Sequence, residues 1–266
     1  MTEPTYLGSR EGLGDRRQQE LEWFVQNIKD DDEPLRQRKE WLHSRWYRDE
    51  HFTTLLDIAS ARDARMTFCF LSRDVAERQD VIRRMVAEGH EVATHGSRHF
   101  LINERHDHEF LHDDLSECID QLAGLGVSCK GMWLSAHGKL DGDRAADALR
   151  DVGLEWFSSG IEHPEADLPD GLRFVPQLDP HDFALLIDSP EPLEAVRVHW
   201  DEMATRSEHG VMLFHPFSLT MISDDITEMW SDWLRSVGGS VPVDEFDGST
   251  GRPSIVLDCS LHLHMM

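Results

Sequence analysis

The chain has 266 residues, and its 51 acidic side chains outnumber the 26 basic ones, which gives a formal charge of −25. This length suits one large α/β domain, and a hydrophobic content of 39% can form a sizeable core, so the acidity coats a folded protein and does not signal disorder. The composition argues against nucleic-acid binding, because no basic stripe offsets the repulsion from a phosphate backbone.

Apolar runs alternate with amphipathic segments from residue 66 onward. Runs of strand length lie at 66–71, 90–93, 131–134, 174–175, 184–187 and 211–214. Apolar residues at helical spacing predict helices over 81–86, 111–125, 145–152, 193–203 and 226–237. Strands separated by such helices indicate βαβ units and a mainly parallel sheet, open or closed into a barrel. In these folds the chemistry lies at the carboxyl ends of the strands.

The composition of the first residues suggests where the folded domain begins. Residues 1–18 are interpreted as an acidic N-terminal arm, followed by a single catalytic domain over 19–266. Residues 1–17 lack an apolar stretch with a cleavage site, and no apolar run approaches membrane length. We therefore expect a soluble, cytoplasmic protein that binds no membrane. Only four of the basic residues are lysines, which together with the acidity is typical of a halophilic-type surface.

The four cysteines, Cys69, Cys118, Cys129 and Cys259, are scattered through the chain without a C-x-x-C pair. This spacing disfavours a zinc ribbon or a thioredoxin-type redox site. We expect reduced, buried thiols.

A histidine pair, His95 and His99, follows the strand predicted at 90–93. Imidazoles four residues apart can face one metal ion, and Gly96 lets the chain turn beside them. Sixteen histidines make such pairs common, and His108 with His112 forms another on a polar stretch that is interpreted as a solvated helix face. The position of His95 and His99 at a strand end distinguishes them from that second pair.

The block from Ala64 to His99 resembles the NodB-type polysaccharide deacetylases, carbohydrate esterases that remove acetyl groups from sugars. Its Ala64-Arg-Met-Thr-Phe-Cys-Phe70 is similar to that family's "ATFF" strand, and Glu88-Gly-His-Glu-Val-Ala-Thr-His95 to its "EGHEIA-x-H". Weaker similarity continues through 131–159 and at Leu213-Phe-His-Pro216, so that about two thirds of the chain is covered.

The resemblance implies a distorted (β/α) barrel that holds one divalent transition metal, with zinc as the expected ion. The ligands would be one Asp and two His, the latter matching His95 and His99, and a late His matching His215 would protonate the leaving group. Three protein ligands leave room for water and the substrate carbonyl, as hydrolysis requires. An alternative for His215 is an ordinary hydrogen-bonded imidazole at a strand end.

The acidic motif of the family is expected upstream of Met66, where Asp30-Asp31-Asp32-Glu33 is the only dense carboxylate cluster. If residues 23–28 form a strand, Asp30 would be the base and Asp31 the metal ligand. Apolar residues in the same run also follow helical spacing, which makes the carboxylates equally consistent with the solvated end of a helix.

Trp133 stands where the family carries an Arg that orients the base, and Ser135 stands where it carries a Pro. An indole cannot make the charge-assisted pair of an Arg with a carboxylate. Trp133 is a candidate sugar-stacking surface, although core packing is the commoner fate of a Trp beside a strand.

Three functional hypotheses follow. The first is a metal-dependent hydrolase that removes acetyl from an N- or O-acetylated carbohydrate, acting on carbon–nitrogen but not peptide bonds. The second is a catalytically degenerate barrel that binds a glycan or a partner, motivated by the missing Arg. The third is a related C–N hydrolase of small cyclic amides, because no export signal directs this chain to a cell-wall polymer.

Overall fold

The computed structural model of this chain describes residues 48–97, 108–134, 143–160, 168–182, 184–188, 191–220, 222–249 and 251–260. The acidic arm at 1–18 lies outside these ranges, and the single domain over 19–266 stays a prediction. None of the described helices is both long and apolar enough to cross a membrane.

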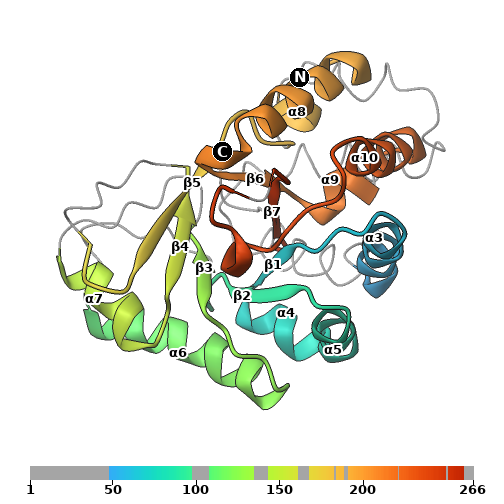
Figure 1. Cartoon of the computed structure of the whole chain (residues 1–266). Helices are drawn as coiled ribbons and strands as arrows, with labels where there is room; N and C mark the ends of the chain where they lie inside the picture. The colour runs from blue at the N-terminus through green and yellow to red at the C-terminus, as the bar shows by residue number, and fades with distance from the viewer. Residues whose placement is uncertain are drawn as a thin grey trace, which may run out of the picture.

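The described strands form a closed barrel in which every neighbouring pair is parallel (Figure 1). In order around the ring they are β1 (Thr67–Phe70), β2 (Glu91–Thr94), β3 (Gly131–Trp133), β4 (Trp156–Ser159), β5 (Arg173–Leu178), β6 (Val211–Phe214) and β7 (Ser254–Asp258). β7 completes the ring, because it pairs with β6 on one side and with β1 on the other. The predicted parallel (β/α) barrel is thereby confirmed.

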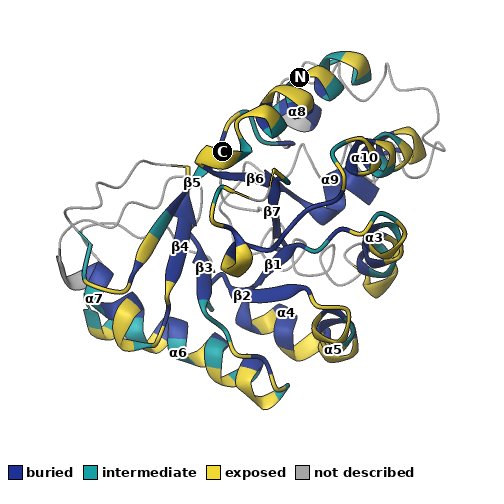
Figure 2. Cartoon of the chain, in the orientation of Figure 1, coloured by how far each residue is buried: buried dark blue, intermediate teal, exposed yellow. Residues whose placement is uncertain are grey.

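Helices surround this barrel. They are α3 (Asp49–Ala61), α4 (Ser72–Glu77), α5 (Gln79–Ala87), α6 (His108–Gly124), α7 (Asp143–Asp151), α8 (Leu193–Thr205), α9 (Pro216–Thr220) and α10 (Asp224–Ser236). Figure 2 shows buried strands at the centre and helices that are exposed on their outer sides, as parallel sheets require. Three short helical turns lie between these elements: η2 (Ala184–Asp188), η3 (Ser207–His209) and η4 (Val243–Glu245).

The apolar spacing predicted five of the described helices, α5, α6, α7, α8 and α10, and five of the described strands, β1, β2, β3, β5 and β6. It did not predict α3, α4, α9, β4 or β7. α6 buries Leu111, Leu115, Cys118 and Leu122, four of the residues that define its predicted apolar face. The run at 184–187 differs, because Ala184–Asp188 forms a π-helical turn and not a strand. A short apolar run without flanking turn signals does not distinguish a strand from a buried helical turn.

The core has two main layers, one inside the barrel and one between the strands and the helices. Inside, large rings fill the lumen, including Trp133 and Trp156. Only a glycine fits at position 131 beside the Trp156 side chain, because a Cβ atom there would lie 1.8 Å from the Trp156 ring. Outside the barrel, the ring of Phe214 in β6 packs edge-to-face against the ring of Trp200 in α8, with 5.3 Å between the ring centroids. These contacts fix the strand whose end carries the late histidine.

The amino end of the barrel is closed by a buried carboxylate. Glu91 accepts hydrogen bonds from Thr67 Oγ1 at 2.6 Å, Trp156 Nε1 at 2.8 Å and the Asp244 backbone N–H at 3.1 Å. Burial outweighs these donors and raises the pKa of Glu91 to about 7. The hydrogen bonds tie β2 to β1, β4 and η4, which is a structural role at this end of a barrel.

We predict that Glu91 makes stability fall as pH rises between about 4.5 and 7. The unfolded side chain releases its proton near pH 4.5, whereas the folded one keeps it to about pH 7, so the folded state binds more protons over this interval. The loss approaches about 3 kcal/mol above pH 7. Urea unfolding across this range should show a shallower decline for Glu91→Gln than for wild type.

The matched control is Glu194→Gln, at an exposed position on α8. Its stability should follow the wild-type curve throughout. Parallel pH curves for Glu91→Gln and wild type would show that Glu91 is ionised in the folded barrel at neutral pH.

Candidate active site

Two of the predicted histidines come together at the carboxyl end of the barrel. His95 directly follows β2 and His215 directly follows β6, and both are buried. Between them stands Asp258, the last residue of β7, whose Oδ2 lies 3.5 Å from His95 Nε2 and 3.9 Å from His215 Nε2. The strand ends thus place a carboxylate against two imidazoles.

His95 is oriented by backbone groups. Its ring Nδ1 lies 2.6 Å from the Trp133 carbonyl oxygen, which can only accept, so Nδ1 carries the proton. The backbone N–H of His95 donates to the Phe70 carbonyl oxygen at 2.8 Å, which fixes the residue against β1. In the neutral ring the lone pair therefore lies on Nε2, the atom directed at Asp258.

The turn after His95 requires a glycine. Gly96 has φ +80, and a Cβ atom there would lie 2.5 Å from Asp114 Oδ2. That same carboxylate oxygen accepts the Ser97 N–H at 2.9 Å, and the Asp114 carbonyl accepts the Ser97 hydroxyl at 2.8 Å. α6 thereby holds the loop that leaves His95.

His215 is held by a second buried carboxylate, Asp182, which follows β5. Asp182 Oδ1 accepts from His215 Nδ1 at 2.7 Å, and Oδ2 accepts from the His215 backbone N–H at 2.7 Å. The Ser218 hydroxyl donates to the same Oδ2. Asp182 therefore fixes the tautomer of His215 and directs Nε2 toward Asp258.

Asp258 is anchored through its Oδ1 oxygen. Its Oδ1 accepts from the Ser260 N–H at 2.8 Å and from the Ser260 hydroxyl at 2.7 Å. Its Oδ2 is the oxygen that faces both imidazoles. The carboxylate is fully buried, so its orientation is set by these neighbours.

Three of the predicted site residues lie outside the described ranges: Asp30, Asp31 and His99. Their roles stay predictions. Sequence reasoning missed Asp258 and Asp182. The apolar β-branched run that ends at Asp258 was a usable signal, whereas Asp182 follows no regular pattern.

Trp133 has no exposed surface, and its ring belongs to the core cluster inside the barrel. A sugar-stacking ring must present a face to the ligand, so the structure favours the core-packing alternative for this residue. Its contribution to the site is the backbone carbonyl that orients His95.

The other candidate groups are structural. His108 and His112 lie on α6 with side chains about two-fifths exposed, in agreement with a solvated helix face. The cysteines are free, and burial raises the pKa of Cys69 and Cys259 well above the usual range, so these thiols remain protonated. This protonation makes them poor nucleophiles.

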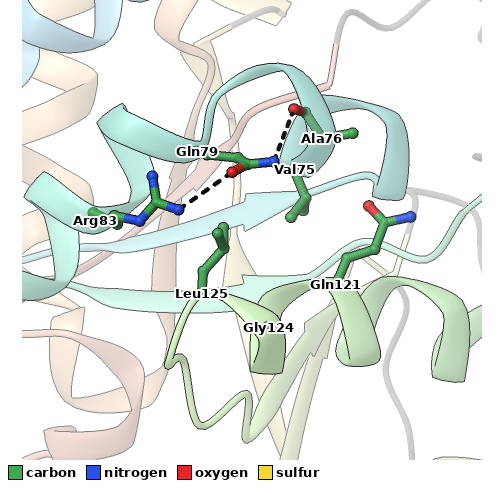
Figure 3. Close-up of a pocket in the computed structure, with 7 residues that line it drawn as sticks. All are labelled: Val75, Ala76, Gln79, Arg83, Gln121, Gly124 and Leu125. Atoms are coloured by element: carbon green, nitrogen blue, oxygen red, sulfur yellow. Dashed lines mark hydrogen bonds between the residues drawn. The ribbon is translucent and has the colours of Figure 1, made fainter.

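A separate pocket of about 270 Å³ opens between α4, α5 and the end of α6 (Figure 3). Its wall is formed by Val75, Ala76, Gln79, Arg83, Gln121, Gly124 and Leu125. Arg83 donates to Gln79, and the lining includes no carboxylate, imidazole or thiol. This pocket lacks the groups that hydrolysis needs.

A metal ion at the barrel mouth would need several donor atoms close together. Within the described residues, no three His, Cys, Asp or Glu side chains gather closely enough to hold an ion. Two suitable donors do meet, since two ligands on one tetrahedral zinc ion, each about 2.1 Å from it, lie about 3.4 Å apart. The 3.5 Å between His95 Nε2 and Asp258 Oδ2 fits that value.

Comparison with known proteins agrees with this architecture. Residues 31–157 match the family model "Polysaccharide deacetylase". No curated protein matches the sequence. The family match confirms the resemblance to the NodB-type deacetylases, and solved structures with the same barrel agree with it.

Solved structures of low identity share the fold. A putative polysaccharide deacetylase from Mycobacterium smegmatis is 20% identical with a TM-score of 0.56, over 71% of this chain and 70% of that one. A family 4 carbohydrate esterase from Streptomyces lividans, in complex with acetate, is 14% identical with a TM-score of 0.51, over 77% and 91%. A family 4 pseudoenzyme from Bacillus anthracis is 14% identical with a TM-score of 0.52, over 79% and 66%, so this chain spans just under two thirds of its length.

We predict that Gly96→Ala destabilises the protein more than Gly126→Ala does. Both glycines have left-handed backbone, with φ +80 and +82, so both substitutions carry the same strain of about 1–2 kcal/mol. Only Gly96 is crowded by Asp114, whereas nothing lies within 4 Å of a Cβ at Gly126. Urea unfolding should give Gly96→Ala an additional loss of about 1–3 kcal/mol from overpacking.

Equal losses for the two variants would contradict the tight contact between the His95 turn and α6.

Proposed function

We propose that this chain, with the fold of the polysaccharide deacetylases, is a metal-dependent hydrolase that removes an acetyl group from an N- or O-acetylated carbohydrate. The observation that carries the proposal is the convergence of His95, His215 and Asp258 at the mouth of the barrel. His95 and His215 occupy the positions that the sequence resemblance gives to a metal ligand and to the proton donor.

The metal ion and its ligand His95 have distinct parts in the proposed hydrolysis. When bound, a divalent ion such as zinc supplies an acidified water and a polarised acetyl carbonyl. His95 presents Nε2 as a ligand, and its Nδ1 hydrogen bond to Trp133 holds that orientation. The predicted partners of His95 in metal binding are His99 and a carboxylate.

His215 moves a proton at Nε2. Hydrolysis joins the water oxygen to the acetyl carbon and breaks the bond from that carbon to nitrogen or oxygen. The water gives up its proton to the base, for which Asp30 is the predicted residue, and the leaving group takes a proton from His215. Asp182 accepts from Nδ1 and stabilises the imidazolium that carries this proton. Acetate and the free amine or alcohol are the products.

The main alternative is a barrel that binds a glycan without turnover. One structure that shares this fold is named a pseudoenzyme, so the fold alone does not decide activity. Trp133, where the family carries an Arg, is the feature that favours this alternative. Hydrolysis of a small cyclic amide is the other alternative, and it uses the same mouth of the barrel.

We predict that zinc-loaded wild-type protein releases acetate from N-acetylated chito-oligosaccharides or from O-acetylated sugars. His215→Ala should lower kcat by about 10²- to 10⁴-fold, because the leaving group loses its proton donor. The measurement is enzymatic quantification of acetate.

His209→Ala provides the control, since its side chain on η3 is 71% exposed. This variant should match wild type. A wild-type protein that releases no acetate but binds the oligosaccharide would favour the non-catalytic barrel, and turnover of a cyclic amide alone would favour the third hypothesis.

We predict that Asp182→Asn lowers kcat by about 10²- to 10⁴-fold while the barrel stays folded. The amide can accept one hydrogen bond from His215, but it cannot stabilise a protonated imidazole as a carboxylate does. The alkaline limb of the pH–rate profile should therefore move to lower pH. Thermal unfolding measured in parallel separates this effect from a loss of stability.

An unchanged pH–rate profile in Asp182→Asn would show that Asp182 only supports the fold.

A further inference from the structure

We infer that Asp258, at the end of the last barrel strand, is the carboxylate ligand of the metal ion in this site. This inference rests on the proposed function, which brings the metal to the barrel mouth. It replaces Asp31, which the family resemblance predicts on a strand upstream of Met66.

The first argument is the closure of the barrel. β1 carries the segment that resembles the family's "ATFF" strand, and both of its edges are occupied, by β2 and by β7. Cys69 of β1 lies in register with Ala93 on one side and Asp258 on the other. The edge of β1 opposite β2 is therefore filled by β7.

The sequence of β7 suits that position. Ser254-Ile-Val-Leu-Asp258 is apolar and β-branched, and it ends in a carboxylate. The run before Asp30 instead has the helical spacing already noted. A closed ring fixes which strands are neighbours but not where the chain begins, so the acidic strand can stand last instead of first.

The second argument is the chemistry of the facing atoms. His95 Nδ1 holds the ring proton, so in the neutral ring Nε2 points a lone pair at Asp258 Oδ2 from 3.5 Å. With the ring neutral, these two electron-pair donors repel each other, whereas a metal cation held between them attracts both. The separation matches two ligands of one tetrahedral ion, about 3.4 Å.

The third argument is the orientation of the carboxylate. Ser260 holds Oδ1 through its N–H and its hydroxyl, which leaves Oδ2 as the oxygen directed at the histidines. Metal-binding carboxylates are commonly fixed in this way by hydrogen bonds to the other oxygen. Ser260 therefore acts as a positioning residue for Asp258.

The test is the metal content of the full chain, reconstituted with zinc in high salt and measured by elemental analysis. We expect about one ion per chain in wild type and its loss in Asp258→Asn, with Asp31→Asn unchanged. Asp201→Asn, on the outer helix α8, is the matched surface control and should also keep the ion. Retention of the ion in Asp258→Asn, or its loss in Asp31→Asn, would overturn the inference.

Ser260→Ala provides a second variant that does not remove a buried charge. It should weaken zinc affinity by about tenfold, measured by competition with a chromophoric chelator, because one of the two bonds to Oδ1 is lost. Unchanged affinity in Ser260→Ala would contradict the inference even if Asp258→Asn failed to fold.

The outcomes separate this inference from the proposed function. Zinc bound through Asp258 without release of acetate would leave the ligand assignment intact and remove the deacetylase proposal. Acetate release by Asp258→Asn with its zinc retained would do the reverse.

Discussion

The pairing of β7 with both β6 and β1 is the constraint on which the rest of this structure depends. Without it, the other strands would form an open sheet with two unpaired edges, and the lumen packing around Trp133 and Trp156 would be exposed. The same pairing carries Asp258 to a place between His95 and His215. Closure of the core and assembly of the site therefore depend on the same strand pairing. A substitution that disrupts β7 would affect both.

The two ends of the barrel use buried carboxylates differently. At the amino end Glu91 receives three hydrogen bonds, and its pKa rises to about 7. At the carboxyl end Asp182 and Asp258 are buried against imidazoles instead. Imidazole can carry charge or bind metal, so carboxylates here can support chemistry, whereas Glu91 supports packing.

Sequence could predict the parts of this molecule that depend on local pattern. The spacing of Leu111 and Leu115 located α6, and the apolar run at 211–214 located β6. Strand-end placement singled out His95, and the family resemblance singled out His215. Asp258 was missed because its role depends on ring closure between segments far apart in the chain, which local spacing does not report. Asp182 was missed because it holds His215 from an irregular segment, where no period indicates which side chain points inward.

The missing Arg at position 133 is compatible with the proposed ligand assignment. An Arg would pair with both oxygens of a carboxylate and would place its own positive charge where a metal ion binds. Ser260 holds Oδ1 of Asp258 with neutral donors, and Oδ2 faces His95. A ligand carboxylate obtains its positive partner from the ion, so β3 is free to use Trp133 for the lumen core. The departure at Trp133 thus bears on the orientation of the base, and so on the non-catalytic alternative, and not on Asp258 as a ligand.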